Sequence, residues 1–499
     1  MKIVVIGAGL GGLTFGALAA RDGHQVEIFD KNGAPGGVVA LLEHEGFKFE
    51  QGPLLIGDML ETEPVYEFLK TLGITLETER ADRGIVMPDY DMIHPDEYAG
   101  PYWRREKLKK LFPEQSKGID AYYRLYEDVL EVRWLSLQPK SFANELKKTL
   151  KMLKLAKYAK MNVDELTRHF FRDERICTLF SGIFADFCAD PKEVQGLGTV
   201  FMNMETAFEK RIPLDKDGKH HYYPAYCYIK GGCQKLPEAL ADYITAHGGT
   251  FRYHTVVEKV LIEDGKATGI RLADGTVVKA DMVIGCGAGK DFFEKTVGRE
   301  YLDAEYKKIL DTFRPMEAVF MVHLGVDYDP MQFMKSALYY CYGMYDLSAA
   351  TEKLRTGVYH GGDDGFLIFV PSHHAPDFAP EGKHCVTLYT VAPDTLKDET
   401  WEDTKEAYAD RMIALAEKYL PDLSSHVVTR KIMTAEDYRR YTHMEKSSFG
   451  GVVPIWNQQN PKHITPVKGL IFVGQQSENA GGVGAVIMGA KDAYLKAMK

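Results

Sequence analysis

The sequence predicts an α/β fold: a doubly wound dinucleotide-binding domain of the Rossmann type, with a mixed α+β domain inserted into it. Three observations lead to this prediction. The β-branched run Lys2–Ile6 ends in a glycine turn, Gly7–Gly12, which opens a stretch of helical spacing. A second group of glycines lies at 474–484, near the other end of the chain. Between these groups, over about 85–225 and 292–442, glycine becomes rarer and aromatic and charged residues more common.

The first glycine turn has the spacing G-x-G-x-x-G, and each glycine has its own physical reason. Gly7 permits a tight turn, Gly9 lets a pyrophosphate approach the backbone, and Gly12 lets the helix pack closely on the strand. The positive end of the helix dipole faces the phosphates. Asp30 follows the expected strand Gln25–Phe29, 18 residues after Gly12, where a carboxylate can accept a ribose hydroxyl. The pattern predicts a dinucleotide site and disfavours a 2′-phosphate there; NAD and FAD both fit it.

The middle of the chain contains further glycine turns and predicted strands. A glycine turn at 231–232 leads into a helix, and 248–257 is predicted to form one strand. Asp274-Gly275 is typical of a hairpin turn between two further strands. The run 281–284 is a buried strand, and the glycines that follow it lack the third-glycine spacing and the acid that a second nucleotide site would show.

Like the N-terminal part, the C-terminal part of the chain is predicted to contain a strand, a group of glycines and a helix in that order. A strand at 469–474 is followed by a polar loop, the glycines at 481–484, and a helix towards Lys499. The predicted division of the chain is a discontinuous nucleotide domain (1–84, 226–291 and 443–499) and a substrate-binding domain (85–225 and 292–442).

Composition excludes several classes of protein. The 499 residues include 61 Lys and Arg against 71 Asp and Glu, a net charge of −10, which argues against a nucleic-acid partner. The seven cysteines show no CxxC spacing, so we expect reduced thiols, a cytoplasmic location and no metal site. Five glycines interrupt the apolar N-terminus, which therefore predicts a strand and helix rather than a signal peptide. No uninterrupted apolar run reaches the ~18 residues that would predict a membrane span.

Two further glycine turns carry a family resemblance. Lys31–Gly37 and Gly46–Pro53, together with the C-terminal pattern, resemble the flavoprotein superfamily of phytoene desaturases, retinol saturases, flavin amine oxidases and protoporphyrinogen oxidases. In that superfamily a G-G-R-x turn and a G-F-x-F-D-x-G-P stretch follow the acid. Here Val38 stands in place of the arginine, Glu50 in place of the aspartate, and Gln475 in place of an acid seen in many relatives.

The resemblance implies that the dinucleotide is FAD and that a hydride passes between flavin N5 and a C–C or C=C bond of a hydrophobic polyene or isoprenoid-like substrate. This is the chemistry of a desaturase or saturase, with NAD(P)H as a candidate reductant. It further implies that the backbone of Val257 meets the adenine and that the helix start near Val483 faces the flavin pyrimidine. The full set of residues expected at the cofactor is Gly7, Ala8, Gly9, Leu10, Gly11, Gly12, Asp30, Lys31, Gly36, Gly37, Val38, Pro53, Leu54, Val257, Cys286, Gly474, Gln475, Gly482, Val483 and Gly484.

Two aromatic stretches, 221–228 and 338–345, mark the substrate half. Tyr222, Pro224, Tyr226 and Tyr228 alternate and are expected to share one face of a strand. Tyr226 and Tyr228 are the candidate catalytic residues, as proton donors or as walls of the substrate cavity. The alternative is that these rings simply pack a sheet core.

A basic segment, 146–161, holds six lysines and no acid. As an amphipathic helix it could make peripheral contact with an anionic membrane, although a solvated helix face explains the same pattern.

Three other functions remain open. A flavin amine oxidase shares the nucleotide domain, but its lysine and paired aromatic cage cannot be located here. A redox-neutral isomerase that uses flavin has the same sequence signature. A non-catalytic module that binds prenylated proteins has the same architecture, but the intact Asp30 and the glycines at 481–484 argue against it. The sequence says nothing about oligomeric state.

Overall fold

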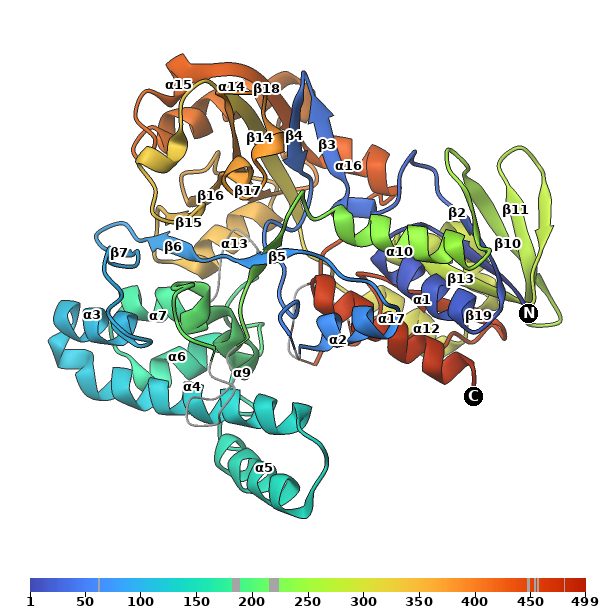
Figure 1. Cartoon of the computed structure of the whole chain (residues 1–499), viewed down its shortest axis with the longest axis horizontal. Coiled ribbons are helices and arrows are strands. Elements are labelled where there is room, and N and C mark those ends of the chain that lie inside the picture. The colour runs from blue at the N-terminus through green and yellow to red at the C-terminus, as the bar shows by residue number, and fades with distance from the viewer. Residues whose placement is uncertain are drawn as a thin grey trace.

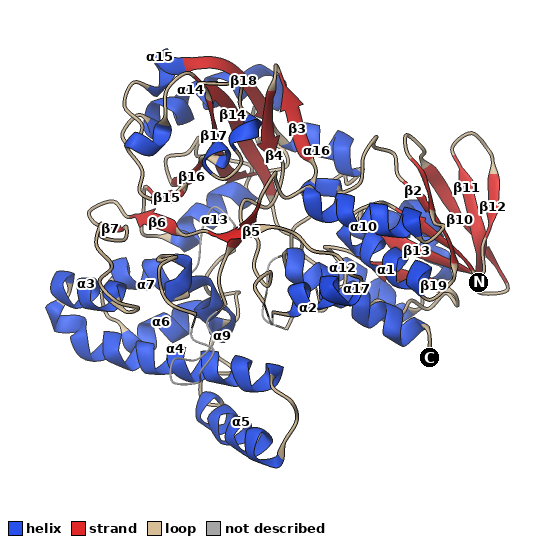
Figure 2. Cartoon of the chain, in the orientation of Figure 1, coloured by secondary structure: helices blue, strands red, loops and turns tan. Residues whose placement is uncertain are grey.

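The structure is a computed structural model of the whole chain (Figure 1), and it describes all residues except 62, 182–188, 215–223, 447–448, 453–454, 456 and 480. Two sheets organise the molecule. One is a five-stranded parallel sheet near both ends of the chain, and the other is a seven-stranded mixed sheet (Figure 2).

The parallel sheet has the order β19–β13–β1–β2–β9, and each neighbouring pair is parallel. β1 lies at its centre, with Val5 opposite Ile284 of β13, and Ile284 is in turn opposite Ile471 of β19. β1, β13 and β19 are apolar, largely buried runs, as parallel strands usually are, whereas the edge strand β9 is largely exposed. The strand bounds are β1 Lys2–Ile6, β2 Gln25–Phe29, β9 Thr250–Arg252, β13 Met282–Cys286 and β19 Leu470–Val473.

Three helices cover one face of this sheet: α1 (Leu10–Arg21), α10 (Lys235–Ala246) and α17 (Val483–Ala497). α1 packs between the other two. The rings of Phe15 and Tyr494 meet edge to face at 5.2 Å, and the Tyr494 hydroxyl donates to Asp22 at 2.6 Å. The first and last helices of the chain are therefore joined directly.

The opposite face carries a three-stranded antiparallel sheet: β10 (Val257–Glu263), β11 (Lys266–Leu272) and β12 (Val277–Lys279). The hairpin between β11 and β12 turns at Gly275, as predicted. The single strand expected over 248–257 is wrong: the chain forms β9, then turns at His254 with a φ of 52°, then begins β10. The turn arises because the amides of His254 and Thr255 bond to the carbonyls of Asn32 and Asp30.

The seven-stranded sheet has the order β18–β14–β17–β16–β15–β6–β7, and β14, the strand next to the edge strand β18, is buried along its whole length. Its strands are β6 Arg83–Val86, β7 Asp91–Met92, β14 Ala318–Val326, β15 Leu338–Tyr342, β16 Gly365–Phe369, β17 His384–Ala392 and β18 Val427–Met433. Two short pairs complete the strands: β3 Leu41–His44 with β4 Phe47–Glu50, and β5 Thr78–Arg80 with β8 Cys227–Ile229.

Helices α3 to α7 gather in one region at the bottom of the view, with α5 at its outer end (Figures 1 and 2). The remaining helices are α2 Pro64–Thr71, α3 Trp103–Leu111, α4 Ser116–Leu137, α5 Phe142–Leu155, α6 Val163–Phe170, α7 Glu174–Phe180, α9 Gly196–Thr199, α11 Gly289–Asp291, α12 Ala304–Thr312, α13 Leu347–Arg355, α14 Trp401–Ala416, α15 Leu423–His426 and α16 Ala435–Thr442.

This architecture confirms the predicted fold class, an α/β dinucleotide-binding domain with a mixed α+β part inserted into its chain. All five strands of the parallel sheet come from the segments assigned to the nucleotide domain. The exact division of the chain between the two domains stays a prediction.

Candidate cofactor site

The glycine loop between β1 and α1 is shaped by contacts that exclude side chains. Gly7 has a φ of 99°, a conformation that favours glycine. A Cβ on Gly12 would lie 2.4 Å from the carbonyl oxygen of Gly7, and a Cβ on Gly11 would lie 2.8 Å from the backbone nitrogen of Gly474. The loop is therefore closed by backbone from the C-terminal segment, and the start of α1 behind Gly9 has no side-chain cap.

The second and third glycine turns lie against the first. The amide of Gly36 donates to the carbonyl of Ala8 at 2.8 Å, and a Cβ on Gly37 would lie 3.5 Å from the Cα of Gly9. A Cβ on Gly52 would lie 2.2 Å from the carbonyl oxygen of Val38. Pro53 and Leu54 follow directly. The structure thus brings the predicted turns at 36–38 and 52–54 to the same site as 7–12.

Asp30 lies at the carboxyl end of β2, nearly buried, beside the glycine loop. One carboxylate oxygen accepts from the amide of Ala8 and the other from the amide of Asn32, each at 2.7 Å. Burial raises its pKa above the usual value, although these two hydrogen bonds act against that shift. The loop at 254–257 meets the chain just after Asp30, which places Val257 at this end of the site. The Lys31 ammonium instead donates to the carbonyl of Arg440.

Cys286 lies beneath the glycine loop at the end of β13. Its Sγ accepts from the amide of Gly12 at 3.1 Å and would lie 3.4 Å from a Cβ on Gly9 and 3.5 Å from one on Gly474. Burial raises the pKa of this thiol to about 11, so it is protonated at neutral pH. Through these contacts Cys286 supports the glycine loop.

At the C-terminal side, β19 ends in Gly474, and α17 begins at Val483 with Gly482 as its N-cap. No described atom lies within 4 Å of a Cβ built on Gly481 or Gly482, so the described part of the chain leaves room beside these two glycines. The half-buried Gln475 lies beside Gly474.

Asp58 is a residue at this helix start that sequence reasoning missed. A Cβ on Gly484 would lie 2.6 Å from Asp58 Oδ2, and Oδ1 of the same carboxylate accepts from Arg133 of α4 at 2.7 Å. The ion pair links the helical region to the start of α17. Its partners are far apart in sequence, and no local pattern could have paired them.

These features fit an extended dinucleotide. Uncapped amides at the start of α1 suit a pyrophosphate, Asp30 suits a ribose hydroxyl, and the start of α17 suits the polar edge of a flavin. Among the described residues, no group of three or more His, Cys, Asp or Glu side chains is placed to hold a metal ion.

Glu50, at the end of β4, joins the first chain segment of the nucleotide-binding part to the second, 226–291. Its Oε1 accepts from the Tyr228 hydroxyl at 2.6 Å and from the amide of Cys233 at 2.9 Å, while Oε2 is buried with no hydrogen-bond partner. Burial raises the pKa of Glu50 to about 7. The Tyr228 ring stacks on His374 at 4.9 Å. The glutamate in place of the family aspartate is thus matched to this tyrosine.

The two candidate tyrosines occupy different surroundings. Tyr228 is wholly buried, and burial raises its pKa well above the usual value. Tyr226 is half-buried; its ring lies 3.9 Å from a Cβ built on Gly57 and 5.4 Å from the buried guanidinium of Arg83. Tyr222 lies outside the described residues. Of the alternating residues expected to share one face of a strand, the structure describes Pro224, Tyr226 and Tyr228. A proton-donating role for either tyrosine stays a prediction.

Arg83 itself was missed by sequence reasoning. Its guanidinium lies 4.9 Å from the ring centroid of Phe208 and 5.2 Å from that of Tyr340, in addition to Tyr226. It donates to the carbonyl of Met202, and its Nε has no hydrogen-bond partner. Aromatic faces stabilise such a buried cation.

The fold and this site define an FAD-dependent oxidoreductase. The chain belongs to the family described as flavin containing amine oxidoreductase, whose model matches residues 10–493.

Individual relatives span nearly the whole chain. It is 25% identical to a chloroplastic prolycopene isomerase of Daucus carota over 97% of this chain and 77% of that protein. It is 24% identical to a zeta-carotene-forming phytoene desaturase of Myxococcus xanthus over 98% of this chain and 92% of that protein. The crystal structure of an oxidoreductase from Methanosarcina mazei shares the fold, with a TM-score of 0.62 and 21% identity over 99% of both chains.

Proposed function

We propose that this flavoenzyme acts on a C–C or C=C bond of a hydrophobic polyene or isoprenoid-like substrate, as a desaturase or a saturase. The observation that carries the proposal is the near-complete overlap with a phytoene desaturase, 98% of this chain and 92% of the relative, which includes the substrate half as well as the nucleotide half. Bound FAD supplies the hydride-transfer chemistry.

The chain's own part is binding, orientation and control of a proton. We expect the turns at 7–12, 36–38 and 474–484 to hold and orient the cofactor. Tyr226 is the better placed of the two tyrosines to deliver or accept a proton, because it is half-buried beside Gly57, a few residues after Pro53 and Leu54. Tyr228 holds Glu50 in place.

A redox-neutral isomerase is the second candidate. The similarity to prolycopene isomerases favours it, because that alignment also spans 97% of this chain. The two candidates share the cofactor site and differ in whether the product gains or loses hydrogen.

The deciding experiment starts from the purified holoprotein. We expect a flavin absorption spectrum and, under anaerobic conditions with phytoene, prolycopene or a polyene alcohol in detergent micelles, a product separable by chromatography. Loss of two hydrogens in the mass of the product supports a desaturase, gain of two with NAD(P)H as reductant supports a saturase, and unchanged mass with altered retention supports the isomerase.

Other outcomes contradict the proposal. Bleaching of the flavin by a primary amine, with no change in any polyene, would place the enzyme among the amine oxidases. A colourless protein that does not take up added FAD would contradict both candidate functions. Because a polyene dissolves in lipid rather than water, we also propose that the enzyme meets its substrate at a membrane surface.

A further inference from the structure

Helix α5 presents an apolar face to solvent. Phe142, Leu146, Leu150 and Leu153 recur at helical spacing and occupy an arc of about 80° on one side of the helix. All four are exposed, Phe142 by 86% and Leu153 by 67%. Of the α5 side chains only Leu155 is buried. A surface helix normally turns its apolar face inward, so this helix is inverted. We call the four residues the apolar stripe.

The polar face of α5 is the one that holds it to the protein. Lys147 and Lys151 each lie 2.7 Å from the Glu131 carboxylate of α4, and Lys151 also pairs with Asp128. Partial burial opposes ionisation of Glu131, but the hydrogen bonds from both lysines lower its pKa to about 2. The lysines of 146–161 therefore do not form one free solvated face: Lys147 and Lys151 pair with the acids of α4, and of the two Lys147 stays exposed.

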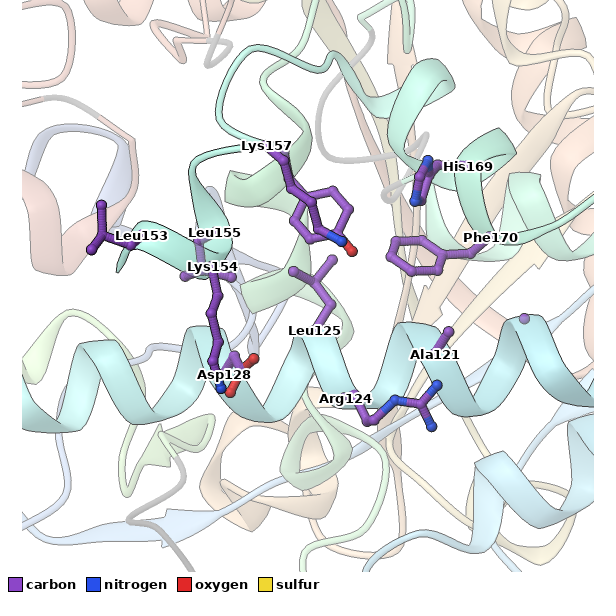
Figure 3. Close-up of a pocket in the computed structure, with 12 residues that line it drawn as sticks. Ala121, Arg124, Leu125, Asp128, Leu153, Lys154, Leu155, Lys157, His169 and Phe170 are labelled. Atoms are coloured by element: carbon purple, nitrogen blue, oxygen red, sulfur yellow. The ribbon is translucent and has the colours of Figure 1, made fainter. Parts of the chain in front are cut away.

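A groove of about 690 Å³ opens beside the stripe, between α4 and the segment that joins α5 to α6. Figure 3 shows side chains from both sides converging on it. Leu153 belongs to the stripe and to the groove, and Leu125 and Phe170 continue the apolar lining. Three cations stand at the same groove and form no ion pair with any described residue: Arg124, Lys154 and Lys157.

We propose that the apolar stripe and these three cations dock the protein on an anionic phospholipid membrane. The stripe enters the boundary between headgroups and acyl chains, and the cations bind lipid phosphates at the groove. The combination of exposed apolar side chains with unpaired cations fits a bilayer surface. The chain carries a net charge of −10, so this cluster is a local feature that sets the orientation of docking.

A second copy of the chain is a poorer occupant. The 14 residues of α5 are about 21 Å long, so a face about 10 Å wide offers about 200 Å². A stable interface needs about 800 Å² from each partner. No helix among the described residues is long and apolar enough to cross a bilayer, and docking from one side does not require one.

The test is flotation of the holoprotein with vesicles of equal parts phosphatidylcholine and phosphatidylglycerol, compared with phosphatidylcholine alone. We expect binding to the anionic vesicles that weakens with added salt. The double variant Phe142→Ser/Leu153→Ser should bind at least tenfold more weakly. The triple variant Arg124→Gln/Lys154→Gln/Lys157→Gln should also bind at least tenfold more weakly. It should no longer prefer anionic vesicles to phosphatidylcholine vesicles.

Matched controls are Val277→Ser and Phe333→Ser, which remove exposed apolar side chains elsewhere and should bind as the wild type does. Flavin content reports folding of every variant. Failure of the wild type to float, or unchanged flotation of the stripe variant, would overturn the proposal. So would a dimer that the stripe variant converts to monomer in size-exclusion chromatography. This inference rests on the proposed function, which places the enzyme at a membrane surface. Because the vesicles contain no polyene, the flotation result does not depend on which substrate the enzyme uses.

Discussion

Glu50 is wholly buried where the hairpin β3–β4 meets the turn before α10, and two donors converge on its Oε1. A carboxyl group in this position is costly to ionise, and burial raises its pKa from 4.5 to about 7. The unfolded chain ionises near pH 4.5, whereas the folded chain keeps the proton until about pH 7. Between these values the folded state binds more protons, so rising pH lowers the free energy of unfolding.

The variant Glu50→Gln should remove this pH dependence. It keeps an acceptor for Tyr228 and carries no charge at any pH. Relative to the wild type, its free energy of unfolding should therefore improve by about 2–3 kcal/mol between pH 4.5 and pH 8. Denaturant unfolding at the two pH values measures this. Glu43→Gln, an exposed glutamate on the same hairpin, should show no such change; an equal change there would contradict the assignment.

The two tyrosines of β8 and its approach should respond differently to loss of the hydroxyl. Tyr226→Phe should lower turnover about 100-fold with FAD content and melting temperature unchanged, as expected for a proton donor. Tyr228→Phe should instead lower stability by about 1–3 kcal/mol, because the buried Glu50 carboxyl group loses one of its two hydrogen-bond donors. The measurements are steady-state turnover and thermal melting. If Tyr228→Phe alone lost turnover and kept its full stability, Tyr228 would be the proton donor and Tyr226 would not.

At the scale of elements, we expect the contact between the loop before α1 and the end of β19 to be needed for binding the cofactor. Gly11→Ala places a Cβ 2.8 Å from the nitrogen and 2.9 Å from the Cα of Gly474. These are backbone atoms, so the clash can be relieved only by moving the chain. We expect the purified variant to contain little FAD, measured by its absorbance ratio. Gly198→Ala, whose Cβ would meet an ordinary contact at 3.6 Å, should retain the cofactor. Full FAD content in Gly11→Ala would show that the contact is not needed.

Elements marked by backbone constraints could be predicted from the sequence. The glycine turns and the β11–β12 hairpin have local signatures, because each needs a tight turn or a close approach that only certain residues permit. The outward face of α5 could not be predicted. Periodicity places lysines and leucines on opposite sides of the helix, but only the acids of α4, Asp128 and Glu131, decide which side turns inward.

The same limit applies within the cofactor site. Asp30 was predicted because it follows a strand at a fixed interval from the glycine loop. The match of Glu50 to Tyr228 was not, since the two are separated by 178 residues and form their hydrogen bond only in the folded chain. Asp58 and Arg133 pair in the same non-local way.

At the scale of the molecule, the cofactor site consists of segments that fold together, so FAD should stabilise the whole nucleotide-binding part. Free FAD at 100 times its dissociation constant should add about 2.7 kcal/mol to the free energy of unfolding. Thermal melting of flavin-depleted protein with and without FAD measures this, and limited proteolysis should show protection of both ends of the chain. Protection of the N-terminal end alone would mean that the C-terminal segment does not close the site.

The central place of β1 in the parallel sheet has a consequence for biosynthesis. β1 and the glycine loop leave the ribosome well before β19 and α17, and β19 begins about 460 residues further along the chain. At about 5–20 residues per second, roughly 20–90 s separate the two ends. Throughout that interval β19 and α17 are not yet present beside the glycine loop, and we expect the loop alone not to retain FAD. We therefore expect cofactor loading to be a late event in synthesis, so that chains without FAD are exposed to aggregation and proteolysis for longest.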